Sequence, residues 1–323
     1  MRHCRTIGFL GGIALTCFVG GSSAPAQTYP SQDVHFVSAA VPGGSPDIIT
    51  RFLAEKMRPL MKRTIVVENK PGALGNIATE YVARAKPDGY TLYVNSGAAM
   101  ASNMHLQKKP PIESIDALPL VATISNHPMT IVVRANAPWQ TLAELAAELK
   151  RKGDKASYGI ANPSAKVFGA LFIQSAGLNA VEVQYKSAAD FPGDLASGAI
   201  DFAVSDSALA LATSRAGTAR ILVVSSAQRS QTMPNVPTMK ELGHNIDLPG
   251  WWAVFAPAGT PKPVMLALNG WFTDVMKQDD AVKFFNGIGG DPLLMGLDEA
   301  QAFYRRQVDD WATYVRVAKI EPQ

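Results

Sequence analysis

Five loops of this sequence are built from glycine or small polar residues, and each follows a short apolar run; the first three of them contain glycine. Glycine lets backbone N–H groups approach a ligand closely, and the N-terminus of a following helix presents unpaired N–H groups and a positive dipole end. Two or more such helix ends facing one cleft would bind an anion without any arginine. Any tight turn from strand to helix needs the same residue types, so both interpretations stay open. The loops are residues 42–45, 71–76, 96–97, 162–165 and 205–207.

Motifs of the common enzyme classes are absent from the sequence. It contains no H-E-x-x-H, G-x-S-x-G or P-loop motif, and Pro292 stands where a dinucleotide fingerprint beginning at Gly287 would need its last glycine. The histidines beyond the N-terminal segment are scattered singly: His35, His105, His127 and His244. Four aspartates could pair as acid and base, although each also fits a cap or turn: Asp47, Asp88, Asp201 and Asp206. We therefore expect no enzyme, no cofactor and no metal site.

The first 26 residues have the organisation of a secretory signal peptide. Two arginines precede an apolar stretch at residues 7–19, which is too short to span a bilayer of about 30 Å. Residues 24–26, Ala-Pro-Ala, are typical of a cleavage site. Both cysteines, Cys4 and Cys17, lie inside this segment, so the mature chain would have no disulfide and no thiolate chemistry. We expect export and cleavage after Ala26.

The mature part of the chain is almost neutral. The sequence has 30 Lys and Arg against 27 Asp and Glu, and two of the basic residues lie in the first 26. The remainder therefore carries 28 against 27, a net charge of +1. Because nucleic-acid-binding domains carry a basic surface, no nucleic-acid partner is predicted. With 323 residues, 47% hydrophobic and 18% charged, the chain is typical of a globular protein of about two domains.

Short apolar runs alternate with helical patterns along the mature chain. This alternation is typical of α/β folds with parallel strands. Helical spacing begins after each glycine loop, and Pro59 is expected to end or kink the first helix near Arg58. A short helix is expected from Asn235, and a final helix over about 298–317. Strands are predicted near 35–41, 64–68, 90–94, 130–133, 158–160, 181–185, 200–204, 221–225 and 252–255.

The order of these elements predicts two α/β lobes between which the chain passes twice. Lobe 1 would contain residues 27–130 and 250–323, and lobe 2 residues 131–249. In open parallel sheets, ligands bind beyond the carboxyl ends of the strands, where the glycine loops lie. The predicted site is therefore a cleft between the lobes.

The loops taken together resemble the Bug family, the solute-binding proteins of tripartite tricarboxylate transporters. The resemblance spans essentially the whole mature chain, and the ordered set of motifs is more specific than any one of them. It implies a two-lobed periplasmic-binding-protein fold, similar to type II, in which each lobe is a mixed, mostly parallel sheet flanked by helices. The matching segments are residues 42–47, 67–76, 87–92, 185–186, 198–201, 226–230, 234–238 and 255–261.

The resemblance also implies a function and a set of partners. It implies a periplasmic monomer that closes on a small organic carboxylate and delivers it to membrane permease subunits. Family members hold the carboxylate with the first two loops, partly through ordered waters. Carried over, this role falls on Pro42, Gly43, Gly44, Ser45, Asp47, Gly75 and Asn76. The third loop adds Ser96, and the opposite lobe adds Ser164, Ala165 and Asp206.

The sequence departs from the family pattern at several positions around the expected pocket. Ala40 stands where an aromatic residue is usual, Val167 and Phe168 stand where His-Leu is common, and Ser187 replaces a glycine. The apolar pair at 167–168 points to an apolar or aromatic acid as ligand. Two other functions stay open: a ligand sensor for a membrane signalling protein, which needs the same cleft, and a hydrolase or isomerase of small acids, which lacks a recognisable nucleophile and base.

The N-terminal segment generates a first prediction. Expressed with its own N-terminus in a bacterium, the protein should be recovered from the periplasm with Gln27 as its first residue, because the apolar stretch and the A-x-A site direct export and cleavage. Intact-mass measurement checks this. A retained Met1, or a lipid on Cys17, would contradict it.

Overall fold

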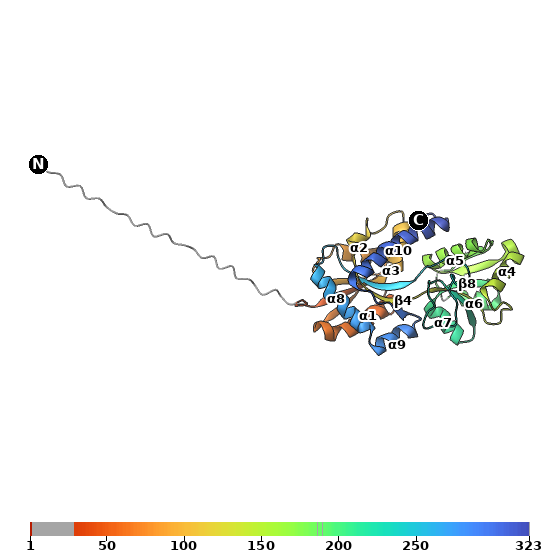
Figure 1. The fold of residues 1–323 in the computed structure, drawn as a ribbon, viewed down its shortest axis with the longest axis horizontal. Coiled ribbons are helices and arrows are strands. Elements are labelled where there is room, and N and C mark those ends of the chain that lie inside the picture. Colours follow the sequence, from red (N-terminus) through yellow and green to blue (C-terminus); the bar gives the residue numbers. More distant parts are fainter. Residues whose placement is uncertain (2–28, 186, 189, 323) are drawn as a thin grey trace.

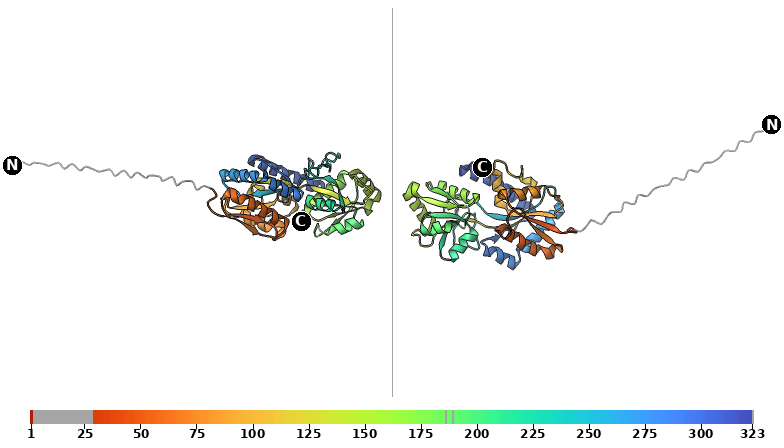
Figure 2. Two further views of the ribbon diagram at one scale, coloured as in Figure 1. Left: turned by 90° about the horizontal axis from the view of Figure 1, so that it is seen from below. Right: turned by 180° about the vertical axis from the view of Figure 1, so that it is seen from behind.

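The computed structural model describes Met1, residues 29–185, 187–188 and 190–322. The predicted signal peptide, apart from Met1, lies outside the described residues. The chain forms two α/β lobes that lie side by side, as the views in Figures 1 and 2 show. Two mixed sheets with helices on both faces form these lobes, so the predicted fold class is confirmed.

Lobe 1 is built on a six-stranded sheet with the order β11-β4-β10-β3-β1-β2. Its strands are β1 (Val34–Ser38), β2 (Ile65–Asn69), β3 (Thr91–Ser96), β4 (Leu120–Asn126), β10 (Trp251–Phe255) and β11 (Asp291–Pro292). Its helices are α1 (Ser45–Met61), α2 (Asn76–Ala83), α3 (Gly97–Leu106), α8 (Lys262–Met276), α9 (Asp279–Gly287) and α10 (Leu297–Val317). Helices α1, α8 and α9 share one core with Phe36, whereas α2, α3 and α10 share the other with Tyr93, so the sheet is buried on both faces.

Lobe 2 is built on a five-stranded sheet with the order β7-β6-β8-β5-β9. Its strands are β5 (Met129–Arg134), β6 (Ser157–Ile160), β7 (Val181–Gln184), β8 (Phe202–Asp206) and β9 (Ala219–Val224). Its helices are α4 (Leu142–Lys152), α5 (Pro163–Ser175), α6 (Phe191–Ser197) and α7 (Ser207–Arg215). Strands β6, β7 and β8 are parallel, and β5 runs antiparallel to β8 and β9. The residue boundaries proposed for the lobes stay a prediction.

The chain passes from the first sheet to the second through only His127 and Pro128, between β4 and β5. Strand β10 is antiparallel to both β3 and β4, so β4 runs in the same direction as β1, β2 and β3. These four strands therefore end toward lobe 2. Because β5 begins at the same crossing and is antiparallel to β8, the parallel strands β6, β7 and β8 end toward lobe 1.

One local prediction is wrong, and the end of another element is shifted. Helix α1 ends at Met61 rather than near Arg58, because Pro59 lies exposed in the last turn, where a helix carbonyl that loses its partner can bind water. No helix forms from Asn235. That segment is fixed as turns against β9 by a bridge between Val224 and Thr238, with the Val224 N–H donating to the Pro237 carbonyl at 2.9 Å.

His127 is packed tightly at the crossing between the lobes. Its Nε2 lies 2.8 Å from Ser125 Oγ, and its backbone N–H donates to the Gly250 carbonyl at 2.6 Å. A Cβ on Gly290 would lie 2.3 Å from the imidazole ring, so only glycine fits there. Burial lowers the pKa of His127 to about 4, although a backbone interaction at Ile288 opposes the shift. The ring is therefore neutral at physiological pH.

This burial predicts a pH-dependent stability. Between pH about 6.5 and about 4 the unfolded chain protonates His127 while the folded chain does not, so the free energy of unfolding should fall as the pH falls through this window. The contribution of His127 would be at most about 3 kcal/mol. Urea unfolding at pH 7 and at pH 4.5 checks this prediction. The free energy of unfolding should differ less between the two pH values in H127N than in the wild type. Equal differences would contradict the assignment.

Candidate functional site

The loop between β1 and α1 is held by Asp47, whose side chain is 2% exposed. Its carboxylate accepts hydrogen bonds from the Gly43 N–H at 2.8 Å, Arg51 Nε at 2.9 Å and Asn69 Nδ2 at 2.8 Å. The Asn69 amide also donates to the Ala40 carbonyl at 2.9 Å. The loop after β1 is thereby fixed to the end of β2.

The charge of Asp47 is balanced inside the protein. Burial would raise its pKa, but the hydrogen bonds from Arg51, Gly43 and Asn69 outweigh burial and lower the pKa to about 2. Asp47 is therefore ionised, and its charge is paired with the Arg51 guanidinium. In this arrangement Asp47 positions the loop, and its negative charge is shielded from a ligand carboxylate.

The loop between β2 and α2 lies beside the first. It contains the short 3₁₀ turn Ala73–Gly75, and Gly75 adopts φ +93°, in the left-handed region that favours glycine. A Cβ on Gly75 would lie 3.5 Å from the Ala39 Cβ and from the Tyr93 hydroxyl. The predicted ligand-binding loops of lobe 1 are thus brought together in the structure.

The helices at the cleft differ in how their N-termini are capped. α1 follows Gly44 and α2 follows Gly75, and neither has a side-chain cap. In contrast, α3, α5 and α7 are capped by their own side chains, through Ser96 to the Ala99 N–H at 3.2 Å, Asn162 to the Ala165 N–H at 2.8 Å, and Asp206 to the Leu209 N–H at 3.0 Å. First-turn N–H groups of a helix have no acceptor within that helix. Pro46 has no N–H, and the Asn76 N–H donates to the Ala73 carbonyl, so the other first-turn N–H groups of α1 and α2 are the donors that a ligand could use.

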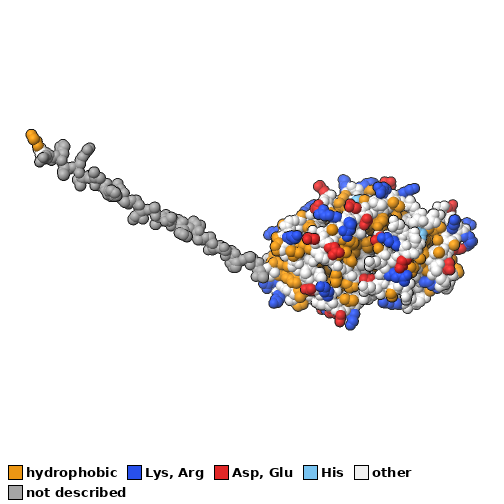
Figure 3. Space-filling view, viewed as in Figure 1, with side chains coloured by type: hydrophobic (Ala, Val, Ile, Leu, Met, Phe, Trp, Pro, Cys, Tyr) orange, Lys and Arg blue, Asp and Glu red, His pale blue; other side chains and the backbone are white. Residues whose placement is uncertain are grey.

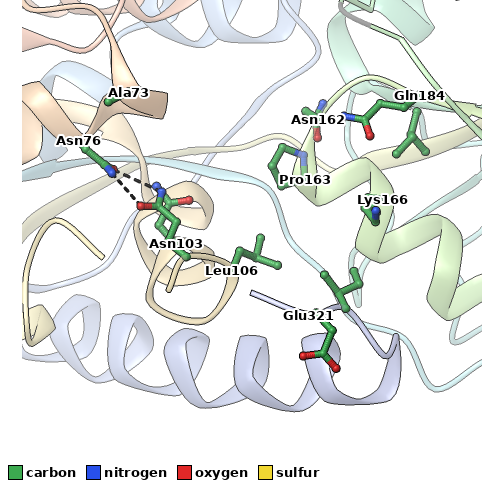
Figure 4. Close-up of a pocket in the computed structure, with 12 residues that line it drawn as sticks. Ala73, Asn76, Asn103, Leu106, Asn162, Pro163, Lys166, Gln184 and Glu321 are labelled. Carbon is green, nitrogen blue, oxygen red and sulfur yellow. Dashed lines mark hydrogen bonds between the residues drawn. The ribbon is translucent and has the colours of Figure 1, made fainter. Parts of the chain in front are cut away.

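A cavity of about 360 Å³ lies between the two lobes (Figure 4). Lobe 1 contributes the start of α2 and the end of α3, lobe 2 contributes β6, β7 and the start of α5, and the segment after α10 closes one side. Its polar lining is dominated by amides, of which Asn76 and Gln107 are joined by a hydrogen bond of 2.7 Å. The lining residues are Ala73, Asn76, Asn103, Leu106, Gln107, Ile160, Asn162, Pro163, Lys166, Gln184, Ile320 and Glu321.

The residues predicted from the sequence fall into three groups around this cavity. Asn76 lines it, and Gly75 and Ser164 adjoin lining residues in the chain. Ala165 is fully buried, and its backbone N–H donates to the Asn162 side chain, so this N–H is not available to a ligand. The rest of the predicted residues whose side chains are described lie at the facing edges of the lobes but do not line the cavity: Pro42, Gly43, Gly44, Asp47, Ser96 and Asp206. Ser45 is the first residue of α1, and its predicted role is not tested.

The interpretation of Val167 and Phe168 as pocket residues is wrong. Both side chains are completely buried in the hydrophobic core, and neither of them lines the cavity. The preceding Lys166 lines the cavity instead. The structure therefore gives these two residues no part in choosing an apolar or aromatic ligand.

Sequence reasoning missed the lining residues at the end of α3, on β7 and after α10. Asn103 and Gln107 are four residues apart, a spacing that places them on one side of the chain as α3 ends. Such polar pairs are common on exposed helix faces, so the spacing alone could not identify them. Gln184 and Ile320 reach the cavity only through the packing of distant segments.

The chain resembles known proteins along most of its length. Residues 49–319 match the tripartite tricarboxylate transporter family receptor. The chain belongs to this family. BugT of Bordetella pertussis is 28% identical over 322 residues, covering 98% of each chain. The solved structure of the periplasmic binding protein BugD is 31% identical, with a TM-score of 0.74 over 91% of this chain and 100% of that one.

A further solved structure shares the fold. A protein of R. palustris, Rpa4515, with adipate is 24% identical and has a TM-score of 0.78, covering 91% of this chain and 100% of that one. Members of the tricarboxylate receptor family are periplasmic solute-binding proteins, so the prediction of a binding protein rather than an enzyme is confirmed. The resemblance to the Bug family is confirmed as well.

Membrane spans and metal-binding clusters are both absent from the described residues. No helix in that part of the chain combines the length and apolar character of a membrane span. Nor do three or more His, Cys, Asp or Glu side chains of those residues gather as they would around a metal ion.

The role of Asp47 generates a prediction about stability. D47A should lower the free energy of unfolding by about 2–3 kcal/mol, because Arg51 and Asn69 lose a charged acceptor in a buried position. Glu80 and Arg84 form a matched pair at the same i,i+4 spacing on an exposed face, with 3.2 Å between Oε2 and Nη2. E80A should lower the free energy of unfolding by less than about 0.5 kcal/mol. Urea unfolding compares them, and similar losses would refute the positioning role.

Proposed function

We propose that this protein captures a small organic carboxylate in the interlobe cleft and delivers it to the membrane permease subunits of a tripartite tricarboxylate-type transporter. The observation that carries the carboxylate assignment is the pair of helix N-termini without side-chain caps, α1 and α2, on neighbouring loops that face the cleft. Backbone N–H groups at such ends favour a negative ligand group.

The electrostatics of the site support this ligand class. Asp47, the buried acid nearest the α1 terminus, is neutralised by Arg51, so it opposes an incoming carboxylate only weakly. The amides that line the cavity can donate to oxygens and accept from hydroxyl groups of the same ligand. The net charge near +1, with both signs spread over the face in Figure 3, makes long-range steering weak. Affinity would come from desolvated donors and from closure of the lobes.

The relatives support delivery to a transporter. The family is named for its role as a receptor of tripartite tricarboxylate transporters, and a neighbour with the same fold holds adipate, a carboxylate. On this basis the chain acts in the periplasm as a monomer after cleavage behind Ala26. Its partners would be the permease subunits, and the ligand would be released chemically unchanged.

A ligand screen tests the proposal. The mature protein is heated with mono-, di- and tricarboxylates, and at least one should raise its melting temperature. A ligand present at 100 times its dissociation constant should add about 2.7 kcal/mol to the free energy of unfolding. If no carboxylate stabilises the protein while another class of solute does, the proposed ligand class is wrong.

Gly75 provides a prediction about the binding loops. G75D should bind the carboxylate found in the screen more than tenfold more weakly than G75N. Two like charges about 4 Å apart repel by roughly 4 kcal/mol at an effective dielectric of 20, and half of this exceeds a factor of ten. Titration calorimetry on both variants checks it.

The asparagine variant is the matched control for this experiment. Asn has the shape of Asp, tolerates the positive φ about as well, and meets the same neighbours at 3.5 Å, an ordinary contact distance. Any loss of affinity that both variants share is therefore caused by the added side chain and not by its charge. Equal affinities would show that Gly75 is a turn glycine away from the ligand carboxylate.

A further inference from the structure

Helix α10 packs on the sheet of lobe 1, but its last turns also reach lobe 2. One hydrophobic cluster contains Trp311 and Val315 of α10 together with Phe168 of α5. The Tyr314 hydroxyl donates a hydrogen bond to the Asp247 carbonyl, in the segment that leads from β9 back to β10. Figures 1 and 2 show the C-terminal end of the chain beside the junction of the lobes. The lobes are therefore joined here by packing, in addition to the two passages of the chain.

The chain turns sharply where α10 ends. Lys319 adopts φ +53°, in the left-handed region. The Lys319 N–H donates to the Arg316 carbonyl at 3.1 Å, and the Ile320 N–H donates to the Val315 carbonyl at 3.0 Å. These two hydrogen bonds around a left-handed residue form a Schellman motif, which ends a helix and fixes the direction of the residues that follow. The direction of residues 320–322 is thus set by the backbone of α10 itself.

This direction makes the C-terminal segment a wall of the interlobe cavity. Ile320 and Glu321 line the cavity, as Figure 4 shows for Glu321. The same segment borders a second hollow, which lobe 2 lines with Lys166, Ala170 and Glu182. Ile320 is partly buried and packs against the cluster that α10 and α5 share. Because the Lys166 ammonium is paired with Glu182 at 3.2 Å, within its own lobe, the segment can leave without breaking that ion pair.

We propose that residues 319–322 form a strap that closes one side of the interlobe cavity and holds lobe 2 against lobe 1. The strap has a fixed direction, because its turn depends only on α10. Its packing depends on one partly buried isoleucine, a contact weak enough to break when the lobes separate. Opening of the cavity would then involve release of the C-terminal segment as well as bending of the two chain passages.

A single thiol on the cavity lining can report whether the strap is closed. Both cysteines of the sequence lie in the first 26 residues, so a protein that begins at Gln27 has none. L106C places one thiol at a partly buried position on the cavity lining. Its rate of reaction with a water-soluble aromatic disulfide, in the absence of any ligand, measures access to the cavity. K155C, at an exposed position after α4, gives the rate for a free thiol.

Two substitutions at Lys319 test the turn in the L106C background. Proline cannot adopt φ +53° and loses the N–H that donates to Arg316, so K319P should misdirect the strap. It should raise the reaction rate roughly tenfold, the factor expected for losing one partly buried isoleucine contact. K319G removes the same charge but should keep the rate within about twofold of the parent, because glycine adopts a positive φ freely.

A second matched pair tests Ile320 without changing the turn. I320S should also raise the rate of L106C, because serine cannot replace the apolar contact. V317S is its control: Val317 is a β-branched residue in the last turn of α10, 38% exposed and outside the cavity lining. V317S should leave the rate unchanged. The rate of K155C should be the same in every background, and circular dichroism checks that each variant is folded.

Every other outcome would overturn the strap. If L106C reacts as fast as K155C in the parent protein, the cavity is already open. If neither K319P nor I320S reacts faster than the parent, the segment does not close the cavity. If K319G matches K319P, or V317S matches I320S, the effect comes from a lost charge or a frayed helix end. The proposed function is tested separately by the ligand screen, because no ligand enters this experiment.

Discussion

The direct passage of β4 into β5 through His127 and Pro128 decides how the rest of the molecule is arranged. Because the connection is too short to allow any other geometry, the end of one sheet must meet the start of the other. The strand directions then bring every loop that follows a parallel strand to the junction between the lobes. The cleft and its polar loops are thus a consequence of topology. Glycines at positions 250, 289 and 290 let the segments at this junction approach each other closely.

The two lobes offer different chemistry to the cleft. In lobe 1, two helices begin at glycines and leave backbone donors without side-chain caps, and Asp47 is used to hold the loop that presents one of them. In lobe 2, the starts of α5 and α7 are capped by Asn162 and Asp206, and Lys166 and Gln184 line the cavity.

Much of the fold could be predicted from the sequence because its signals are local. The strands that were predicted all formed, with ends shifted by a few residues, and α10 begins one residue before its predicted start. No strand is predicted at residues 120–126, where β4 forms. In that stretch Thr123 and Ser125 alternate with apolar residues, but the structure buries them too, because β4 is covered on both faces. Pro59 did not end α1, since its effect depends on its place in the last turn and on exposure to water.

By itself, the sequence determined the alternating α/β pattern, the near-neutral mature chain, and the glycine loops that begin α1 and α2. These properties depend on residues close together in the chain. Only the tertiary structure decided that Asp47 is buried and accepts a hydrogen bond from Asn69, that Val167 and Phe168 belong to the core, and that Lys166 lines the cavity. The orientation of a helix about its axis, and the partners of a buried charge, are set by segments distant in the sequence. Local patterns carry no information about those contacts.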